Sequence, residues 1–369
     1  MNLFVFGSSL TSSYWNGAAT YYRGIYKHLA ALGLHVIFAE PDAYGRQQHR
    51  DPEDFSYAEV VVYDSPRDIP GLLRRARQAD LVIKHSGVGV DDARLEERVL
   101  ECKSRSTQVA FWDVDAPATL AEVEANVLHP FRALIPEYDY IFTYGGGPPV
   151  IARYEGLGAR VCHPIYNALD PKTHYPVAPD PANACDLVFV GNRLPDRERR
   201  VEDFFLAAAQ QAPEFKFALG GEGWGGKALP PNVRWLGHVG TKDHNAVNGS
   251  ARMVLNIDRE SMARTGYSPP TRIFEAAGAG ACVVTDAWEG IETFFEPGCE
   301  ILVAHDAGEV VDLLRTVDVR LAREIGDAMR RRAMLEHTYA LRALQVREIL
   351  RQSTPEVFAW RNRALQQPA

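Results

Sequence analysis

The sequence predicts an α/β protein with two domains, each built on a parallel β-sheet covered by helices. Short apolar runs alternate with amphipathic helical patterns, which is the β–α–β order of a parallel sheet. This order starts again after a proline-rich segment, and a glycine turn follows the first apolar run of each half. The length of 369 residues also exceeds what one hydrophobic core usually fills.

The composition is that of an ordinary globular protein, with 46% hydrophobic and 24% charged residues. A formal net charge of -8 argues against a nucleic-acid partner. Five scattered cysteines without a Cys-x-x-Cys pattern fit a reducing compartment and exclude a disulfide scaffold or a zinc cluster. The first residues lack the features of a signal peptide, and no apolar run reaches the roughly 18 residues of a membrane span. We therefore expect a cytoplasmic protein without a transmembrane segment.

The first half opens with a strand over residues 3–6 that runs into Gly7-Ser8-Ser9. This turn differs from the Gly-x-Gly-x-x-Gly dinucleotide fingerprint, but it leads into a crevice between a strand and a helix where a ligand can sit. The candidate residues of this crevice are Ser8, Trp15, Asn16 and Gly17. Further strands are predicted over residues 34–39, 60–63, 81–84, 108–112, 140–143 and 160–163.

Two aspartates follow the strand at 108–112, in the sequence Asp113-Val114-Asp115-Ala116-Pro117. The carboxyl ends of the strands line the ligand crevice in open parallel sheets, so Asp113 and Asp115 are candidates for chemistry. A carboxylate there can act as the general base for an acceptor hydroxyl, with Asp113 the first candidate and Asp115 the second. The alternatives are two aspartates that cap the following helix and an Asp-x-Asp clamp for a metal and a diphosphate.

The second half begins after a segment, residues 164–184, that is rich in proline and lacks periodicity. Strands are predicted over residues 186–190, 215–219, 233–236, 253–257 and 282–285, and residues 320–352 are strongly helical. We expect an N-terminal domain over 1–170, a linker over 171–184, a second domain over 185–352 and a tail over 353–369. The apolar residues Phe358 and Trp360 predict that this tail docks on the N-terminal domain.

The stretch from residue 266 to residue 286 is the strongest candidate for a binding site. Ser268 and Pro269 signal a helix start, because serine caps free amides and proline at the first helical position loses no hydrogen bond. Arg272 near this start, together with free backbone amides, predicts a seat for a phosphate or diphosphate. Glu275, further along the helix, is placed to accept hydrogen bonds from a ribose. The alternative is a capped surface helix with one solvated ion pair.

Two Rossmann-like halves, each with a glycine turn after its first strand, resemble the GT-B fold of nucleotide-sugar glycosyltransferases, in which the two domains face each other across a cleft. Three motifs resemble the CgeB-type (spore maturation protein) family, and the C-terminal third is similar to the donor half of glycosyltransferase family 4. The motifs are Phe111-Trp112-Asp113-Val114-Asp115-Ala116-Pro117, Asp186-Leu187-Val188-Phe189-Val190-Gly191-Asn192-Arg193 and Thr271-Arg272-Ile273-Phe274-Glu275-Ala276.

The resemblance implies roles for individual residues of the second half. In these relatives a Glu-x7-Glu pair holds the donor; Glu275 stands at the second, ribose-binding position, and Tyr267 occupies the first. Arg193 and Arg272 are expected to contact the diphosphate, and the loop that contains His238 is expected to lie against the base. The implied donor-binding residues are Gly191, Asn192, Arg193, Gly221, His238, Ser268, Thr271, Arg272 and Glu275.

The leading hypothesis is a glycosyltransferase that moves a sugar from a nucleoside-diphosphate sugar to an acceptor that the sequence does not identify. Two arginines can neutralise the departing diphosphate, so we expect neither a metal nor another cofactor. The enzyme alternative is a nucleotide-sugar epimerase of the same fold. A two-domain sugar-binding protein and a catalytically silent nucleotide-binding protein are the alternatives outside enzymes.

Overall fold

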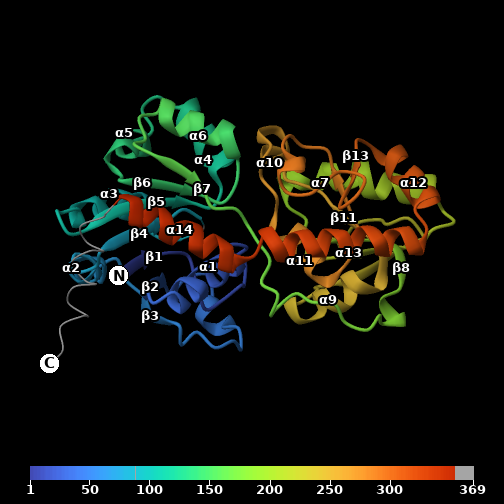
Figure 1. Ribbon diagram of the computed structural model, residues 1–369, viewed down its shortest axis with the longest axis horizontal. Helices are drawn as coiled ribbons and strands as arrows, with labels where there is room; N and C mark the ends of the chain where they lie inside the picture. Colours follow the sequence, from blue (N-terminus) through green and yellow to red (C-terminus); the bar gives the residue numbers. More distant parts are fainter. Residues whose placement is uncertain (88, 354–369) are drawn as a thin grey trace. The chain divides into compact units, whose positions relative to one another are not determined.

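The computed structural model describes residues 1–87 and 89–353. They divide into two compact units, the first containing residues 1–166 together with the last described helix, the second containing residues 167–338. Each unit holds one parallel β-sheet with its own hydrophobic core (Figure 1). The predicted fold class, two α/β units with Rossmann-like sheets, is therefore confirmed.

The first unit contains a seven-stranded parallel sheet in the order β3-β2-β1-β4-β5-β6-β7. The central strands β1 and β4 are buried along nearly their whole length because both faces of the sheet are covered, whereas β3 at the edge is mostly half-buried or exposed. The strands are β1 (Asn2–Phe6), β2 (His35–Pro41), β3 (Ala58–Tyr63), β4 (Leu81–His85), β5 (Gln108–Asp113), β6 (Tyr140–Thr143) and β7 (Cys162–Pro164).

The helices of the first unit come from the crossovers between strands and from the end of the described chain. Helix α14 packs beside α1 (Figure 1), and Gly24 allows this close approach: a Cβ there would lie 2.4 Å from the ring of Tyr339. The helices are α1 (Ala19–Ala31), α2 (Ile69–Ala76), α3 (Asp92–Arg98), α4 (Ala116–Ala125), α5 (Pro130–Leu134), α6 (Gly147–Gly156) and α14 (Tyr339–Ser353).

The second unit contains a six-stranded parallel sheet in the order β10-β9-β8-β11-β12-β13. Its strands are β8 (Cys185–Val190), β9 (Phe217–Gly220), β10 (Val233–Gly237), β11 (Ala251–Asn256), β12 (Val283–Asp286) and β13 (Leu302–Ala304). Its helices are α7 (Pro195–Val201), which a π-helical turn joins to α8 (Ala207–Gln211), α9 (Thr241–Ser250), α10 (Glu260–Thr265), α11 (Thr271–Ala279), α12 (Ala307–Thr316) and α13 (Val319–Glu336).

The boundaries of the two units differ from the predicted domain boundaries. The segment predicted as a linker is part of the second unit, because side chains of α9 satisfy its backbone: Asn245 accepts a hydrogen bond from the Tyr175 amide, and Ser250 accepts one from the Asp180 amide. Residues 339–352, predicted within the second domain, belong to the first unit. The predicted tail lies outside the described residues except for Ser353.

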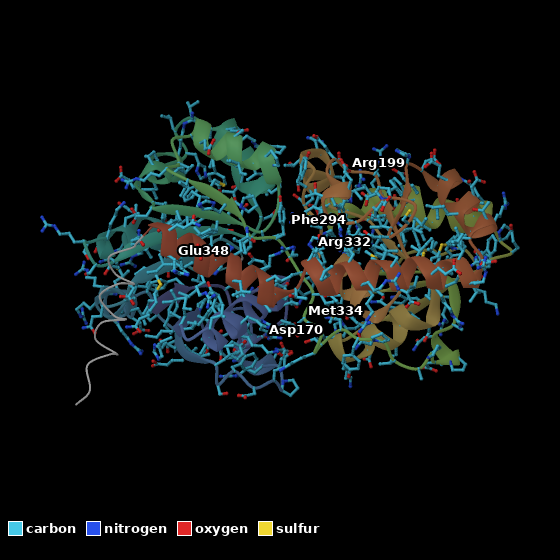
Figure 2. All side chains as sticks on the ribbon, viewed as in Figure 1. Asp170, Arg199, Phe294, Arg332, Met334 and Glu348 are labelled. Atoms are coloured by element: carbon cyan, nitrogen blue, oxygen red, sulfur yellow. The ribbon has the colours of Figure 1, made fainter. Side chains whose placement is uncertain are left out.

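The long helical region predicted over residues 320–352 is two helices, and the chain passes from the second unit to the first between them. The break carries neither glycine nor proline. It is set by packing, because the buried ring of His337 hydrogen-bonds the carbonyl of Phe294 at 3.0 Å and contacts the rings of Phe274 and Phe295. Phe294 is labelled in Figure 2, as are Arg332 and Met334 from α13. Among the described residues, no helix is both long and apolar enough to span a membrane.

Candidate functional site

The carboxyl ends of β8 and β11 form the point of the second sheet where ligands bind in open α/β folds. The strand order reverses there, since β8 is followed on one side by β9 and on the other by β11. The loop after β8 carries Gly191, Asn192 and Arg193, three of the predicted donor-binding residues. The loop after β11 carries Asp258, which the sequence analysis did not select.

The loop after β8 is held in place by the loop after β9. Gly221 has a φ of +120°, and a Cβ there would lie 2.3 Å from the carbonyl oxygen of Gly191, so only glycine fits. The indole of Trp224 donates to that same carbonyl oxygen at 2.8 Å, and the Glu222 amide donates to Asn192 Oδ1 at 3.0 Å. Gly221 therefore acts through backbone packing, which fixes Gly191 and Asn192.

Two guanidinium groups converge on Gly191. A Cβ built on this glycine would lie 3.2 Å from Arg197 Nη2 and 3.3 Å from Arg272 Nη2. Both groups also lie over the ring of Phe189, at 5.8 Å and 5.3 Å from its centroid. Arg197 Nη2 donates to the carbonyl of Asn192 at 2.6 Å, and Arg272 Nη1 donates to Asn256 Oδ1 at 2.6 Å. The two like charges therefore share one edge of the sheet.

The positive charge at this edge is only partly compensated. Arg197 is 8% exposed, and within the described part of the chain its buried Nε has no hydrogen-bond partner. Burial, followed by the neighbouring charge of Arg272, lowers the pKa of Arg197 to about 9. Burial also lowers the pKa of Arg272, against the opposing effect of Asp258. An anion bound here would relieve both effects.

The nearest buried carboxyl groups do not cancel this charge. Burial, followed by the charge of Asp286, raises the pKa of Asp258 well above its usual value, which favours its neutral form. The Asp258 amide donates to Asp286 Oδ1 at 3.1 Å, and Asp286 pairs with Arg200 at 2.5 Å. Asp258 Oδ2 is buried and, among the residues that the structure describes, has no hydrogen-bond partner.

Helix α11 starts later than the sequence predicts. Pro270 is its N-cap residue and Thr271 its first residue, whereas Ser268 is buried and donates its hydroxyl hydrogen to the Gly266 carbonyl at 2.9 Å. The prediction that Ser268 caps the helix is therefore wrong. The cause is Pro270, because a residue that precedes proline, here Pro269, is disfavoured in the helical conformation. Arg272 stays in the first turn, as predicted.

Tyr267, which stands at the first glutamate position of the Glu-x7-Glu pattern, is held in a left-handed conformation with a φ of +47°. Its amide donates to the Glu289 carbonyl at 2.7 Å. A Cβ on Gly290 would lie 2.2 Å from its ring. Such a conformation is costly for a tyrosine, and these contacts impose it.

Glu275 lies on α11 beyond Arg272 and faces two histidines. Its Oε2 is 3.5 Å from Nδ1 of His244 on α9. Burial raises the pKa of Glu275, but the hydrogen bond from His244 and the charges of His174 and His244 outweigh it and lower that pKa to about 2. Glu275 is thus ionised, with at least one oxygen engaged by a histidine.

Two predicted donor-binding residues, Arg193 and His238, have glutamates as partners and do not join Arg197 and Arg272 beside Gly191. Arg193 pairs with Glu198 at 2.6 Å, and its side chain is about one-third exposed. His238 is exposed and 3.6 Å from Glu222. Arg197, four residues further on, lies beside Gly191 instead, and the predicted contact of Arg193 with a diphosphate stays a prediction. Arg197 was missed because both arginines follow the same strand and their spacing does not tell which one turns inward.

Of the predicted catalytic aspartates, Asp113 is the last residue of β5 and Asp115 follows it in the first unit. Asp113 is fully buried and accepts four hydrogen bonds, so its carboxylate has no lone pair directed at solvent. Asp115, next to the start of α4, is half-buried. The donors to Asp113 are the Ser86 hydroxyl at 2.7 Å, the Tyr154 hydroxyl at 2.5 Å, the Asp115 amide at 2.9 Å and the Thr119 hydroxyl at 3.1 Å.

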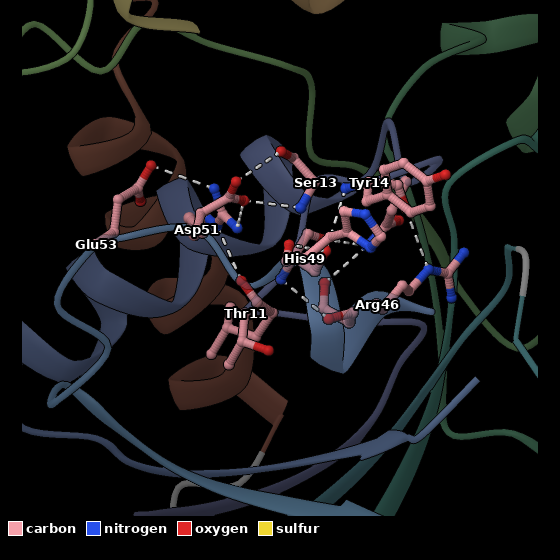
Figure 3. A network of polar contacts seen from close by, with 12 residues as sticks. Thr11, Ser13, Tyr14, Arg46, His49, Asp51 and Glu53 are labelled. Carbon is pink, nitrogen blue, oxygen red and sulfur yellow. Dashed lines mark hydrogen bonds and ion pairs between the residues drawn. The ribbon is translucent and has the colours of Figure 1, made fainter. Parts of the chain in front are cut away.

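The loop after β1 holds the four predicted acceptor-side residues, and buried polar groups fix its shape. Asn16 accepts from the Ser8 hydroxyl at 3.0 Å, and the buried guanidinium of Arg46 donates to the carbonyls of Ser8 and Trp15 at 3.3 Å each. Figure 3 shows the neighbouring contacts of the same loop, where Asp51 accepts from Ser13 and the ring of Tyr14 stacks on that of His49. Trp15 has a strained backbone conformation, with a φ of +48°, and its side chain is 63% exposed. The network therefore holds the indole toward solvent. Gly17 is exposed beside it.

Comparison with known proteins agrees with this architecture. Residues 197–348 match the family model described as glycosyl transferase-like. No curated protein matches the chain. Sucrose-phosphate synthase from Thermosynechococcus elongatus is similar in structure, with a TM-score of 0.69 and 16% identity over 96% of this chain and 99% of that one. The chain has the GT-B fold.

Two further structures support the same conclusion. HepE from Anabaena in complex with UDP-glucose has a TM-score of 0.66 and 13% identity over 95% of this chain and 100% of that one. AviGT4, a glycosyltransferase involved in avilamycin A biosynthesis, has a TM-score of 0.61 and 16% identity over 94% of this chain and 96% of that one. The prediction of a glycosyltransferase is confirmed at the level of this fold and of the domain that the family model matches.

Proposed function

We propose that the protein transfers a sugar from a nucleoside-diphosphate sugar to an acceptor, and that its second unit binds the donor. The observation that carries this proposal is the convergence of Arg197 and Arg272 on Gly191. Two like charges, one buried on Arg197 and one half-buried on Arg272, are costly unless an anion accompanies them. Their position at the reversal of the strand order is where α/β sheets bind nucleotides.

The diphosphate is bound by the two guanidinium groups and the first amides of α11, without a metal ion. Arginine forms strong, directional hydrogen bonds to phosphate oxygens, and a helix N-terminus adds free amide donors. These groups are in place before the sugar leaves, so they stabilise the negative charge that develops on the diphosphate. Burial beside Asp286 raises the pKa of Asp258, which weakens the competition of Asp258 for the same cations.

The nucleoside extends along α11 from this point. Glu275 accepts hydrogen bonds from the ribose, and the loop that contains His238 lies against the base. UDP is the first nucleotide to test, because the related HepE structure was solved in complex with UDP-glucose. The finer likeness to the CgeB-type family and to glycosyltransferase family 4 belongs to this proposal, since Tyr267 replaces the first glutamate of the family 4 pair.

The acceptor binds to the loop after β1 in the first unit, with Trp15 as an aromatic contact. A strained and exposed aromatic side chain is a feature that folded proteins keep at binding sites. Of the two predicted bases we favour Asp115, because Asp113 is fully buried and already accepts four hydrogen bonds, whereas Asp115 is half-buried. Asp113 then acts as a positioning residue for Ser86 and for the start of α4.

The donor site is tested by calorimetric titration of UDP into the wild type and into Arg197→Met and Arg272→Met. Each substitution is expected to weaken UDP binding by about 10-fold or more, because it removes a charge-assisted contact to phosphate. Arg199→Met is the matched control, since Arg199 lies on the same helix α7 and its side chain is 90% exposed. Unchanged affinity in both inner variants would refute the donor site.

Two further measurements separate the proposed reaction from its alternatives. Chelation of divalent ions by EDTA is expected to leave UDP affinity unchanged, and a large loss would refute binding without a metal. Release of UDP from UDP-glucose is expected only when an acceptor is present. Epimerised sugar formed without an acceptor would identify the epimerase instead.

A further inference from the structure

A second cluster of polar side chains lies beside the proposed donor site. His174, from the segment before β8, His244 from α9 and Glu275 from α11 each direct one donor atom to a common point. These three atoms all lie within 4.8 Å of one another, and His244 Nδ1 is 3.5 Å from Glu275 Oε2. Three segments that are distant in the sequence thus meet through an imidazole–imidazole–carboxylate set.

The backbone around His174 is fixed from both sides. The side chain of Asn245 donates to the Thr173 carbonyl at 2.9 Å and accepts from the Tyr175 amide at 3.2 Å. Gly278 on α11 permits the close approach, because a Cβ there would lie 2.7 Å from the His174 carbonyl oxygen and 2.9 Å from its Cβ. His174 is therefore held against both α9 and α11 by contacts that do not involve its ring.

The ring of His174 is left with an unsatisfied nitrogen. The residue is 3% exposed, and Nε2 has no hydrogen-bond partner in the described ranges 1–87 and 89–353. A buried polar atom without a partner is rare, and it calls for a water or an ion. His244 is supported from outside the cluster, since its ring also hydrogen-bonds the backbone of Val239. Histidines that bind metals are usually oriented by such an outer hydrogen bond.

We propose that His174, His244 and Glu275 bind a divalent transition-metal ion, with Zn²⁺ the best match, as a clamp between the three segments. Two imidazole nitrogens and one carboxylate oxygen are a donor set that zinc accepts, with a fourth position left for water. A tetrahedral zinc with ligand bonds of about 2.1 Å needs donor atoms about 3.4 Å apart. The His244–Glu275 pair, at 3.5 Å, is already close to that spacing.

This inference does not depend on the proposed transfer reaction. One oxygen of Glu275 serves the metal, and its second oxygen is free to accept from a ribose, so both roles are compatible. The three ligand residues come together only in the folded protein, so bound zinc is expected to raise the stability of the protein. The arginine pair takes no part in metal binding. The two sites share Glu275, so zinc binding is measured without nucleotide and UDP binding is measured after chelation, and the failure of one is distinguishable from the failure of the other.

The test is a calorimetric titration of Zn²⁺ into the full chain after chelation and desalting, with thermal unfolding followed in parallel. The wild type is expected to bind one zinc ion per chain and to unfold at a higher temperature when zinc is present. His174→Gln and His244→Gln are each expected to weaken zinc binding by about 10-fold or more. His305→Gln is the matched control, because His305 is exposed and pairs with Glu309 as an ordinary surface contact.

Two results would overturn the proposal: no zinc binding by the wild type, or binding of equal affinity and stoichiometry in both inner variants. A variant that fails to fold does not obscure the outcome, because crystals of the wild type grown with zinc provide a second readout. Anomalous scattering at the zinc edge is expected between the two imidazoles and Glu275. A zinc peak elsewhere, with none at this cluster, would refute the clamp.

Discussion

Buried charged groups near the carboxyl edges of the two sheets differ in their hydrogen bonding, although the first edge also contains one buried nitrogen, His85 Nδ1 at the end of β4, without a partner among the described residues. In the first unit, Asp113 accepts four hydrogen bonds, and Glu40 accepts from the Leu10 and Thr11 amides and from side chains of the same loop. In the second unit, Arg197 Nε, Asp258 Oδ2 and His174 Nε2 are buried without hydrogen-bond partners among the residues described.

Buried groups whose hydrogen bonds are satisfied stabilise the fold, whereas buried groups without a partner are candidates for ligand binding. A satisfied buried carboxylate rigidifies its loop and contributes to stability. An unsatisfied buried charge costs stability unless a ligand supplies its partner. We therefore expect the same kind of substitution to destabilise the first edge and to leave the stability of the second edge nearly unchanged.

The largest expected effect is that of Asp113→Ala on the free energy of unfolding. Removing the carboxylate takes the acceptor from four donors, one of them the buried hydroxyl of Tyr154, so we expect a loss of about 3 kcal/mol. Urea unfolding measures it. Asp113→Asn is the milder companion, because the amide oxygen still accepts. Normal stability combined with lost turnover in both variants would instead make Asp113 the base.

A smaller loss is expected for Gly221→Ala at the second edge. The alanine meets the Gly191 carbonyl in a backbone conformation with a φ of +120°, which should cost about 2 kcal/mol and weaken UDP binding by moving Asn192. Gly226→Ala is the matched control, since the nearest described atoms are more than 4 Å from its Cβ position. Equal stability of the two variants would show that the loop is not held through Gly221.

Arg197→Met should change the free energy of unfolding by less than about 1 kcal/mol, in either direction. Its burial cost and its repulsion from Arg272 offset the contact to Asn192. The same variant is expected to bind UDP about 10-fold more weakly or worse. A strongly destabilised protein with unchanged UDP affinity would show that Arg197 stabilises the fold and does not bind UDP.

The smallest effect is expected for Arg193→Ala. In the structure Arg193 pairs with Glu198 near the surface, and such pairs contribute little. We expect UDP affinity to change by less than about 2-fold in the same calorimetric titration. A loss of UDP affinity comparable to that of Arg272→Met would show that Arg193 contacts the diphosphate, as the sequence predicts.

The sequence carried the information for the strands and for the edge where they end. Parallel strands buried on both faces appear as continuous apolar runs, so β1, β4, β5, β8, β11 and β12 were placed within a few residues. Arg272 was predicted at the start of α11 because proline marks that start, although Pro270 moved it three residues beyond Ser268.

The rest depends on contacts between distant residues, which local patterns do not contain. Nothing in the sequence distinguishes the inward Arg197 from the outward Arg193. His174 lies in a segment that resembles a linker, and the hydrogen bonds of this segment with Asn245 and Ser250 attach it to the second unit. The break between α13 and α14 is set by the packing of His337 and not by a helix-breaking residue.

A crystal structure with UDP bound tests the central claim most directly. We expect phosphate oxygens of the bound UDP within about 3.2 Å of the guanidinium groups of both Arg197 and Arg272. A diphosphate bound without either arginine, with Arg197 and Arg272 still facing Gly191 as they do in the free protein, would contradict it.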